Sequence, residues 1–180
     1  MRVRAFLDAN VLYRSITRSV LVTFGELDAF QPLWSDQVND EWMRNLQNNR
    51  PDLDPRRIAR TRALMDQYVD EARVTGFEPL IDTLILPDPK DRHVLAAAVS
   101  CKADYLVTFN LKDFSPSSVR ELHTAVVGPS IFLKELWSLD PSAVEHRLRG
   151  QAEAIGVSTE LLLDRLAKSV PGFVKVVRQS

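Results

Sequence analysis

The first 137 residues alternate short apolar runs with segments whose apolar positions recur at helical spacing. Residues 3–7 are a largely apolar run that ends at Asp8, and apolar positions from residue 11 to residue 22 then follow a helical period. This pattern predicts a buried strand that leads into one helix. Further short strands are predicted at residues 30–34, 82–86, 105–109 and 124–127.

Helices are predicted between these strands. Ser35 is placed to cap a helix whose buried face carries Val38, Trp42 and Leu46, with Glu41 at its flank. Asp54 and Pro55 predict the start of a long helix that runs to about residue 73. Two more helices are expected at residues 88–101 and, capped by Ser130, at 131–137. Alternating strands and helices favour a three-layer α/β/α fold with a mainly parallel central sheet.

The pattern changes at Asp140. Two helical segments, at residues 142–155 and 158–169, surround Gly156 and precede an apolar tail. We therefore predict a first domain of residues 1–139 and a C-terminal helical appendage of residues 140–180. Packing onto the first domain or onto a partner is the favoured role, and a DNA-binding helix-turn-helix is the alternative.

Composition narrows the class of protein. The 180 residues are 45% apolar and 26% charged, with no apolar run long enough to span a membrane and no secretory leader. We therefore expect a cytoplasmic protein that does not enter the membrane. The single cysteine, Cys101, lies in an apolar helical run and is interpreted as a small buried hydrophobe.

The net charge of −1 does not by itself indicate a nucleic-acid-binding protein. Basic residues are nevertheless concentrated at residues 50–62 and again beyond residue 147. A solvated helix face is the ordinary interpretation of such a cluster. Contact with an RNA backbone is the alternative, and its candidate residues are Arg56, Arg57, Arg60 and Lys112.

Four acidic residues fall on separate elements: Asp8, Glu41, Asp91 and Asp113. Most lie at strand ends or in a first helical turn, and the carboxyl ends of parallel strands meet at one edge of a sheet. Clustered carboxylates take up protons unless a cation neutralises them. Oxygen ligands without clustered His or Cys indicate Mg²⁺ or Mn²⁺ and not zinc. Helix capping by Asp88 and Asp91 is a compatible second interpretation.

Four motifs occur in the order typical of one family: Leu7-Asp8-Ala9-Asn10-Val11-Leu12, Glu41, Asp88-Pro89-Lys90-Asp91, and residues 106–114 from Leu-Val-Thr-Phe-Asn to Leu-Lys-Asp-Phe. Together they resemble a PIN domain over residues 1–137. The resemblance implies a metal-dependent ribonuclease, often the toxin of a bacterial VapBC toxin–antitoxin pair. It also implies a cognate antitoxin and, in many relatives, a homodimer.

The same resemblance assigns roles to residues. Asp8, Glu41, Asp91 and Asp113 would be catalytic and metal-binding, and RNA would be hydrolysed in line to a 5′-phosphate and a 3′-hydroxyl. Four residues would orient these ligands from behind: Asn10, Asp88, Thr108 and Asn110. The sequence departs from many relatives at Asn110, where an aspartate is common, so that the fourth carboxylate is assigned to Asp113.

Other classes of protein fit these residues less well. A haloacid-dehalogenase-like phosphatase needs a second aspartate where this chain has Asn10, and a response-regulator receiver needs an acidic pair after the first strand. His93 and His123 invite a general-base role, but the helix and loop positions predicted for them favour structural roles. A non-catalytic PIN-fold module that binds RNA or protein is the remaining alternative.

Overall fold

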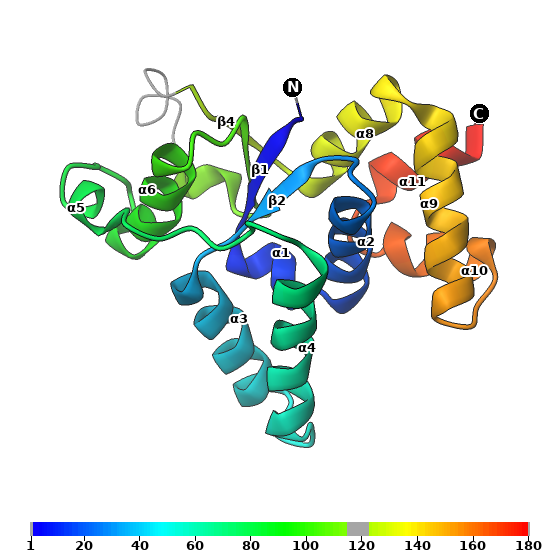
Figure 1. Cartoon of the computed structure of the whole chain (residues 1–180), viewed down its shortest axis with the longest axis horizontal. Coiled ribbons are helices and arrows are strands. Elements are labelled where there is room, and N and C mark those ends of the chain that lie inside the picture. Colours follow the sequence, from blue (N-terminus) through cyan, green and yellow to red (C-terminus); the bar gives the residue numbers. More distant parts are fainter. Residues whose placement is uncertain (1, 115–122, 180) are drawn as a thin grey trace.

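A computed structural model describes residues 2–114 and 123–179 of the chain. Its centre is a four-stranded sheet in the order β2-β1-β3-β4 (Figure 1), in which all neighbouring strands are parallel. The strands are β1 (Arg4–Leu7), β2 (Gln31–Leu33), β3 (Tyr105–Val107) and β4 (Ala125–Val127). The predicted α/β class with a parallel sheet is therefore confirmed. Because β1 and β3 are the two central strands, the residues that follow them lie side by side.

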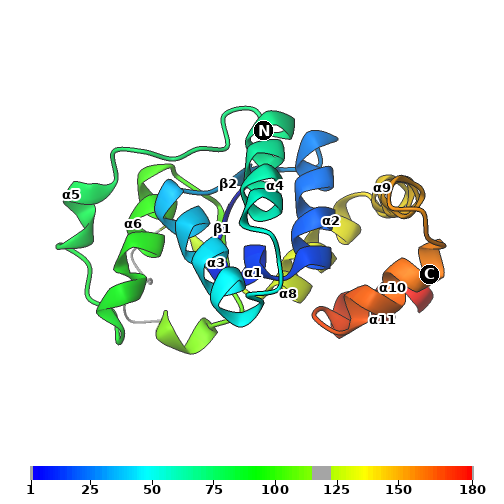
Figure 2. The same cartoon turned by 90° about the horizontal axis from the view of Figure 1, so that it is seen from below.

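Helices cover both faces of the sheet. In both cartoon views α6 (Arg92–Ser100) lies on one side of β1, and α2 (Ser15–Glu26) and α8 (Pro129–Leu139) lie on the other (Figures 1 and 2). The remaining elements of this part of the chain are α1 (Ala9–Tyr13), α3 (Asp36–Asn49), α4 (Pro55–Tyr68), α5 (Glu78–Ile81) and the 3₁₀ turns η1 (Pro89–Asp91) and η2 (Leu111–Asp113). The predicted caps at Ser35, Asp54 and Asp88 are confirmed, since each side chain accepts a backbone N–H of its own first turn.

Four details of the predicted secondary structure are wrong. The expected strand at residues 82–86 is irregular, and the expected helix at residues 11–22 is broken at Arg14, whose ψ of 103° is extended. The long helix ends at Tyr68, before Glu71 adopts a positive φ of 55°. Gly128 caps α8, while the hydroxyl of Ser130 accepts a hydrogen bond from the Phe173 N–H at 2.9 Å. Each error concerns a boundary or a segment whose partners lie elsewhere in the fold.

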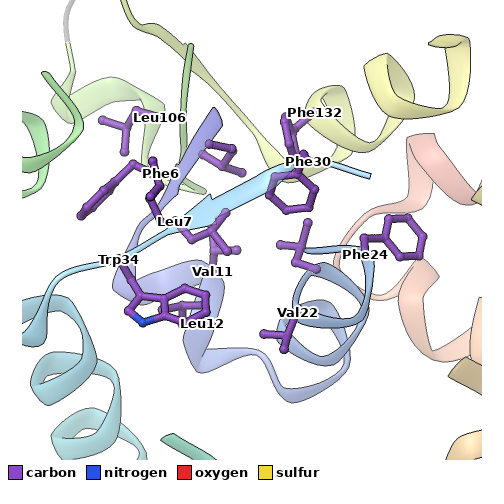
Figure 3. Close-up of a cluster of buried hydrophobic side chains, with 14 of the residues drawn as sticks. Phe6, Leu7, Val11, Leu12, Val22, Phe24, Phe30, Trp34, Leu106 and Phe132 are labelled. Atoms are coloured by element: carbon purple, nitrogen blue, oxygen red, sulfur yellow. The ribbon is translucent and has the colours of Figure 1, made fainter. Parts of the chain in front are cut away.

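The hydrophobic core fills the space between the sheet and its helices (Figure 3). Phe6, Leu7 and Leu106 from the central strands are fully buried. Phe30, which precedes β2, contacts Phe132 of α8 edge to face, with ring centroids 4.9 Å apart. The core therefore fixes the central strands, and with them the positions of Asp8 and Thr108 at their ends.

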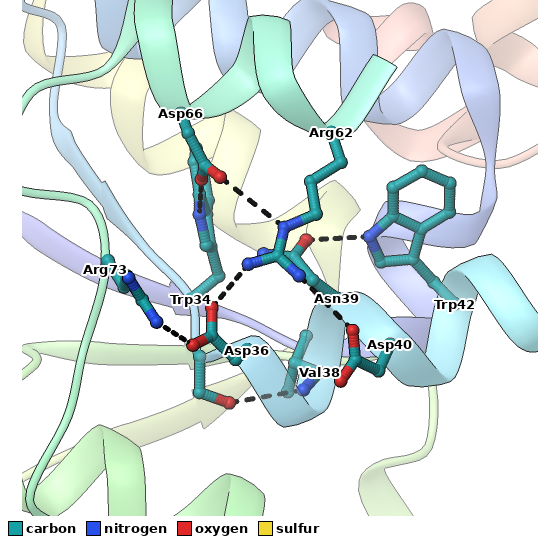
Figure 4. Close-up of polar contacts among 10 residues, drawn as sticks. Trp34, Asp36, Val38, Asn39, Asp40, Trp42, Arg62, Asp66 and Arg73 are labelled. Atoms are coloured by element: carbon teal, nitrogen blue, oxygen red, sulfur yellow. Dashed lines mark hydrogen bonds and ion pairs between the residues drawn. The ribbon is translucent and has the colours of Figure 1, made fainter. Parts of the chain in front are cut away.

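Helices α3 and α4 are joined by polar contacts centred on Arg62 (Figure 4). The guanidinium of Arg62 pairs with Asp36 and Asp40 of α3 and with Asp66 of α4. The indole N–H of Trp34 donates to Asp66 at 2.9 Å. This network holds the two helices side by side, and it occupies Arg62, one of the arginines of the basic cluster at residues 50–62.

The C-terminal segment consists of α9 (Pro141–Ala154), α10 (Thr159–Ala167) and α11 (Pro171–Gln179), so the expected apolar tail is a helix. Leu148, Leu162 and Phe173 are fully buried and belong to the same apolar cluster as the sheet residues. The amide of Gln151 donates to Ser19 of α2 at 2.6 Å. These contacts agree with the favoured role of packing, while the boundary at residue 139 stays a prediction. Within the described ranges, no helix is long and apolar enough to cross a membrane.

Candidate active site

Asp8 is the residue that the fold holds most firmly at the carboxyl edge of the sheet. It follows β1, is 6% exposed, and caps α1 by accepting the Ala9 N–H on Oδ1 at 2.6 Å. Its own N–H donates to the Val107 carbonyl of β3 at 3.1 Å. Asp8, and not Asn10, is therefore the cap of the first helix.

Thr108 and Asn10 complete a network around this carboxylate. The Thr108 hydroxyl and the Asn10 side-chain amide both donate to Asp8 Oδ2, each at 2.6 Å. Asn10 Oδ1 in turn accepts the Phe109 N–H at 3.0 Å, and Thr108 Oγ1 accepts the Asn110 N–H at 3.0 Å. Both residues thus hold Asp8 in one orientation, and their role in supporting a metal site stays a prediction.

The ionisation of Asp8 reflects two opposed effects. Burial raises the pKa of the Asp8 carboxyl, and the hydrogen bonds from Thr108 and Ala9 oppose that rise. The negative charge of Glu41 raises the pKa further, while His93 lowers it. The net result is a pKa above the ordinary value, because the effect of burial outweighs the hydrogen bonds.

Glu41 reaches the same region from α3. Its carboxylate lies 3.6 Å from Nε2 of His93, a residue of α6 that is 7% exposed. The other ring nitrogen of His93, Nδ1, is buried and has no hydrogen-bond partner in the described part of the chain. His93 therefore lies beside Glu41 with little of its side chain exposed.

Asp91 marks the point where the acidic residues converge. Burial raises the pKa of its carboxyl to about 6, and the negative charges of four neighbours add to the rise: Asp8, Asp113, Asp88 and Glu41. Asp88 itself caps η1 by accepting the Lys90 N–H at 2.9 Å, which agrees with its interpretation as a cap. Asp91 thus lies within electrostatic range of every other predicted ligand.

Asp113 comes from η2, beyond β3. Its carboxylate accepts a hydrogen bond from the side-chain amide of Asn110, so the two residues act as a pair. Position 110, where many relatives are expected to have an aspartate, is an asparagine here, and its side chain contacts the Asp113 carboxylate. The predicted role of Asn110 in orienting Asp113 fits this contact.

The four carboxylates suit a hard divalent cation in kind and in charge. Their oxygen-only donors are of the kind that Mg²⁺ and Mn²⁺ prefer, while burial is the main cause of the raised pKa values of Asp8 and Asp91. Over residues 2–114 and 123–179, however, no three side chains of the types His, Cys, Asp or Glu are oriented to hold a metal ion as they stand. A metal-binding role for these carboxylates therefore stays a prediction.

A cleft of about 730 Å³ opens beside these residues. Its walls come from α3, η1, α6 and the segment before α5, and they include Glu41, Asp88, Asp91 and His93. The additional acids Asp36, Asp40 and Glu78 line the same cleft. Arg44 and Lys90 are its two cations, so acids outnumber cations on this side of the site.

The predicted RNA-contacting residues lie outside this cleft. Arg56, Arg57 and Arg60 are exposed on α4, and only Arg57 lines a groove. Lys112 is exposed on η2, next to Asp113. Sequence reasoning missed Arg14 and Arg18, which lie nearer to Asp8 along the chain. The sequence does place both arginines in the segment that directly follows the motif from Leu7 to Leu12.

These features define an α/β protein with a carboxylate cluster at the carboxyl edge of a parallel sheet. The family profile described as PIN domain matches residues 4–112, more than half of the chain. The chain therefore belongs to the PIN domain family. The matched range contains Asp8, Glu41 and Asp91 and ends one residue before Asp113.

One curated relative adds to this assignment. The chain is 34% identical over 93 residues to “Putative ribonuclease VapC50” of Mycobacterium tuberculosis (strain ATCC 25618 / H37Rv). The aligned region covers 50% of this chain and 55% of that protein, so the chain spans about half the length of the curated relative. No solved structure gives a significant match.

Proposed function

We propose that the protein is a divalent-metal-dependent endoribonuclease that hydrolyses RNA phosphodiester bonds, and that it is the toxin of a VapBC-type toxin–antitoxin system. The observation that carries the proposal is the convergence of separate carboxylates on Asp91, beside an Asp8 that Thr108 and Asn10 hold fixed. Membership of the PIN domain family and the name of the VapC50 relative support the same activity. The cytoplasmic location expected from the sequence is part of this proposal.

Asp8, Glu41, Asp91 and Asp113 are the residues that would hold Mg²⁺ or Mn²⁺. A bound ion of this kind supplies positive charge to the scissile phosphate and makes a bound water more acidic. Asp8 contributes a carboxylate of fixed orientation, because both of its oxygens already accept hydrogen bonds from the protein. Asp91 is half-buried and has a pKa of about 6, so it changes its protonation state most readily near neutral pH.

His93 has a positioning role in this proposal. It is buried beside Glu41, with Nε2 3.6 Å from the carboxylate, and it has no access to bulk water from its other nitrogen. A general base must reach the proton it removes, directly or through one water. Its contact with Glu41 suits fixing that carboxylate better than activating a water.

The antitoxin and a homodimer belong to the same proposal. An antitoxin segment that covers the acidic cleft would need positive charge opposite Glu41, Asp88 and Asp91, the charge that a metal would otherwise supply. Co-purification with a small protein encoded beside this one tests the pairing. The mass of the isolated chain in solution tests the homodimer.

The activity itself is tested with purified protein and RNA in magnesium, in manganese and with a chelator. We expect cleavage that needs the metal and that falls by at least about a hundredfold in Asp8→Asn, because the metal loses its most fixed ligand. Asp82→Asn is the matched control, since Asp82 is an exposed acid outside the cleft. Metal-dependent cleavage that survives in Asp8→Asn contradicts the proposal.

A non-catalytic RNA- or protein-binding module is the alternative. It is favoured by one feature, namely that the acidic side chains of the described residues are not oriented for ligation as they stand. Calorimetric titration of Mn²⁺ into the protein separates the two functions. Binding that Asp8→Asn abolishes supports the nuclease, and no binding by the unmodified chain supports the module.

A further inference from the structure

The acidic site has a second opening, on the side of α1, and its charge is opposite to that of the cleft. A groove of about 260 Å³ runs from Asn10 and Glu41 past Phe109 to Tyr13 and Arg14. A second groove of about 500 Å³ shares Tyr13 and Arg14 with the first and continues between α2, α3 and α4. The two grooves therefore lie next to each other, with Tyr13 and Arg14 between them, and the smaller one adjoins the carboxylate Glu41.

We call the two grooves together the basic groove. Four arginines line it: Arg14, Arg18, Arg50 and Arg57. Among the described residues, Glu41 at its inner end is the one acid in the lining. The acidic cleft, by contrast, is lined by six acids and two cations, Arg44 and Lys90. A polyanion that reaches the carboxylates would be repelled along the cleft and attracted along the basic groove.

Arg18 makes the floor of the basic groove an unusual place for a cation. It is 9% exposed, donates to the Leu12 carbonyl at 2.5 Å, and stacks over Trp42 with its guanidinium carbon 4.5 Å from the ring centre. Its burial lowers its pKa to about 10, and no carboxylate in residues 2–114 or 123–179 pairs with it. A buried cation without an anionic partner carries a desolvation cost in free energy. An anionic ligand in this groove would offset part of that cost.

Arg14 and Arg57 can reach such a ligand. The guanidinium of Arg14 lies 4.6 Å from the centre of the Phe109 ring and is exposed. Arg57 is exposed on α4, and the described part of the chain offers its guanidinium no acidic partner. Arg50, in contrast, is already paired with Asp52 at 2.7 Å.

Apolar and aromatic groups alternate with these cations. Tyr13 is half-buried where the two grooves meet, and Phe109 is half-buried in the smaller one. Leu46, Leu53 and Ile58 line the wider groove. Aromatic rings beside cations are the usual features of surfaces that bind single-stranded nucleic acid, because rings stack on bases while cations hold phosphates. A duplex would leave its bases stacked on each other and could not use the rings.

We infer that the basic groove binds a single-stranded RNA segment and leads it into the carboxylate site, with Arg14 and Arg57 on its phosphates and Tyr13 and Phe109 against its bases. The inference rests on the proposed nuclease function for its choice of RNA. Asn10 and Glu41 line the inner end of the smaller groove, so the track begins beside the site.

Helix α4 supplies a matched test of this inference. Arg57 and Arg60 are both exposed arginines on the same helix, but only Arg57 lines the basic groove. Affinity for a fluorescein-labelled oligouridylate of about a dozen nucleotides is measured by anisotropy in chelator, where no cleavage interferes. We expect Arg57→Ala and Arg14→Ala each to weaken binding by about threefold to tenfold and to reduce the salt slope by about 1, and Arg60→Ala to leave both unchanged.

Two further variants sharpen the readout. Arg57→Glu should weaken binding more than Arg57→Ala, and Arg44→Ala, in the acidic cleft, should not weaken it. The corresponding RNA duplex should bind more weakly than the single strand. Circular dichroism confirms that each variant is folded.

The outcomes are distinct. Weaker RNA binding by the Arg57 and Arg14 variants, but not by Arg60→Ala, supports the inference whether or not the protein cleaves RNA. Cleavage itself bears only on the proposed function. Equal effects of Arg57→Ala and Arg60→Ala would show nonspecific attraction and overturn the inference. An affinity that both groove variants leave unchanged would also overturn it and assign the groove to a protein partner.

Discussion

Thr108 and Asp8 are one hundred positions apart in the sequence, and the Thr108 hydroxyl donates to Oδ2 of Asp8 at 2.6 Å. The contact exists because β1 and β3 are adjacent parallel strands, so that the first residue beyond each strand lies at the same edge. Both side chains are buried. The orientation of the key carboxylate therefore depends on the pairing of the central strands.

Replacing Thr108 with valine tests this dependence. Valine keeps the shape of threonine but removes the donor, which leaves a buried carboxylate with one hydrogen bond fewer. We expect the free energy of unfolding to fall by about 1 to 3 kcal/mol and the pKa of Asp8 to rise further. Urea denaturation at neutral pH, in chelator, measures the loss.

The control for this change is Thr83→Val. The Thr83 hydroxyl donates to the Leu80 carbonyl at 2.7 Å, but on the exposed surface, where water replaces a lost partner. We expect a change within about 0.5 kcal/mol. Equal effects of the two substitutions would show that the contact between Thr108 and Asp8 is not important for stability.

Asp91→Asn should stabilise the metal-free protein at neutral pH. The pKa of Asp91 is about 6 in the folded chain, above its ordinary value of 3.8, so the folded state binds this proton more tightly than the unfolded state does. Stability is therefore lost as the pH rises from about 4 to about 6, and the loss persists above that range. After a discount for solvent screening of this half-exposed group, the gain on substitution should be about 1 kcal/mol.

The pH dependence of the melting temperature in chelator checks this sign. The difference between Asp91→Asn and the unmodified protein should be small at pH 4 and should reach its full size by pH 7. Added Mn²⁺ should raise the melting temperature of the unmodified protein more than that of the variant. A variant less stable than the unmodified protein at pH 7 would show that the carboxylate is not under strain.

Much of the fold followed from the sequence because its signals are local. The run before Asp8 and the run at residues 105–109 have the apolar character of buried strands, and both became the central strands of the sheet. The segment at residues 82–86 has a similar composition but is irregular, and composition alone could not reveal this. The break at Arg14 was equally hidden, because the apolar spacing continues across it.

The candidate site was predictable in its residues but not in its surroundings. Asp8, Glu41, Asp91 and Asp113 could be selected because carboxylates at strand ends and in first turns meet at one edge. The hydrogen bond from Thr108 could not be foreseen, since Thr108 reaches Asp8 only through the pairing of β1 with β3. The separation of Arg57 from Arg60 likewise depends on which face of α4 points toward α3, which a run of arginines does not indicate.

Arg62→Ala should weaken the contact between α3 and α4 and so destabilise the protein. Burial alone would raise the pKa of Asp36, but hydrogen bonds from Arg73 and Arg62 bring it below its ordinary value. Loss of Arg62 leaves Asp36, Asp40 and Asp66 near one another without their shared cation. We expect a loss of about 1 kcal/mol at neutral pH, discounted for the partial exposure of these groups.

The sign with pH follows from the lowered pKa of Asp36. Its contribution is present above the ordinary carboxyl pKa of about 4 and is lost as the pH falls below it. The effect of Arg62→Ala on urea denaturation should therefore shrink between pH 7 and pH 3. Arg60→Ala, on the same helix, should have no effect beyond about 0.5 kcal/mol. An effect of Arg62→Ala that does not change with pH would point to lost packing instead of lost charge.

Two glycines in helices should respond to alanine in opposite directions. A Cβ on Gly25 of α2 would lie 2.3 Å from Cγ of Pro32, in the buried contact with β2, so Gly25→Ala should destabilise the protein by about 2 kcal/mol or more. Gly150 lies inside α9, where an added methyl group would meet no other atom of the described chain within 4 Å, so Gly150→Ala should stabilise the protein by about 0.5 to 1 kcal/mol. Thermal unfolding of both variants measures the difference. Destabilisation by Gly150→Ala would show that the exposed face of α9 is covered by a partner or a second copy of the chain.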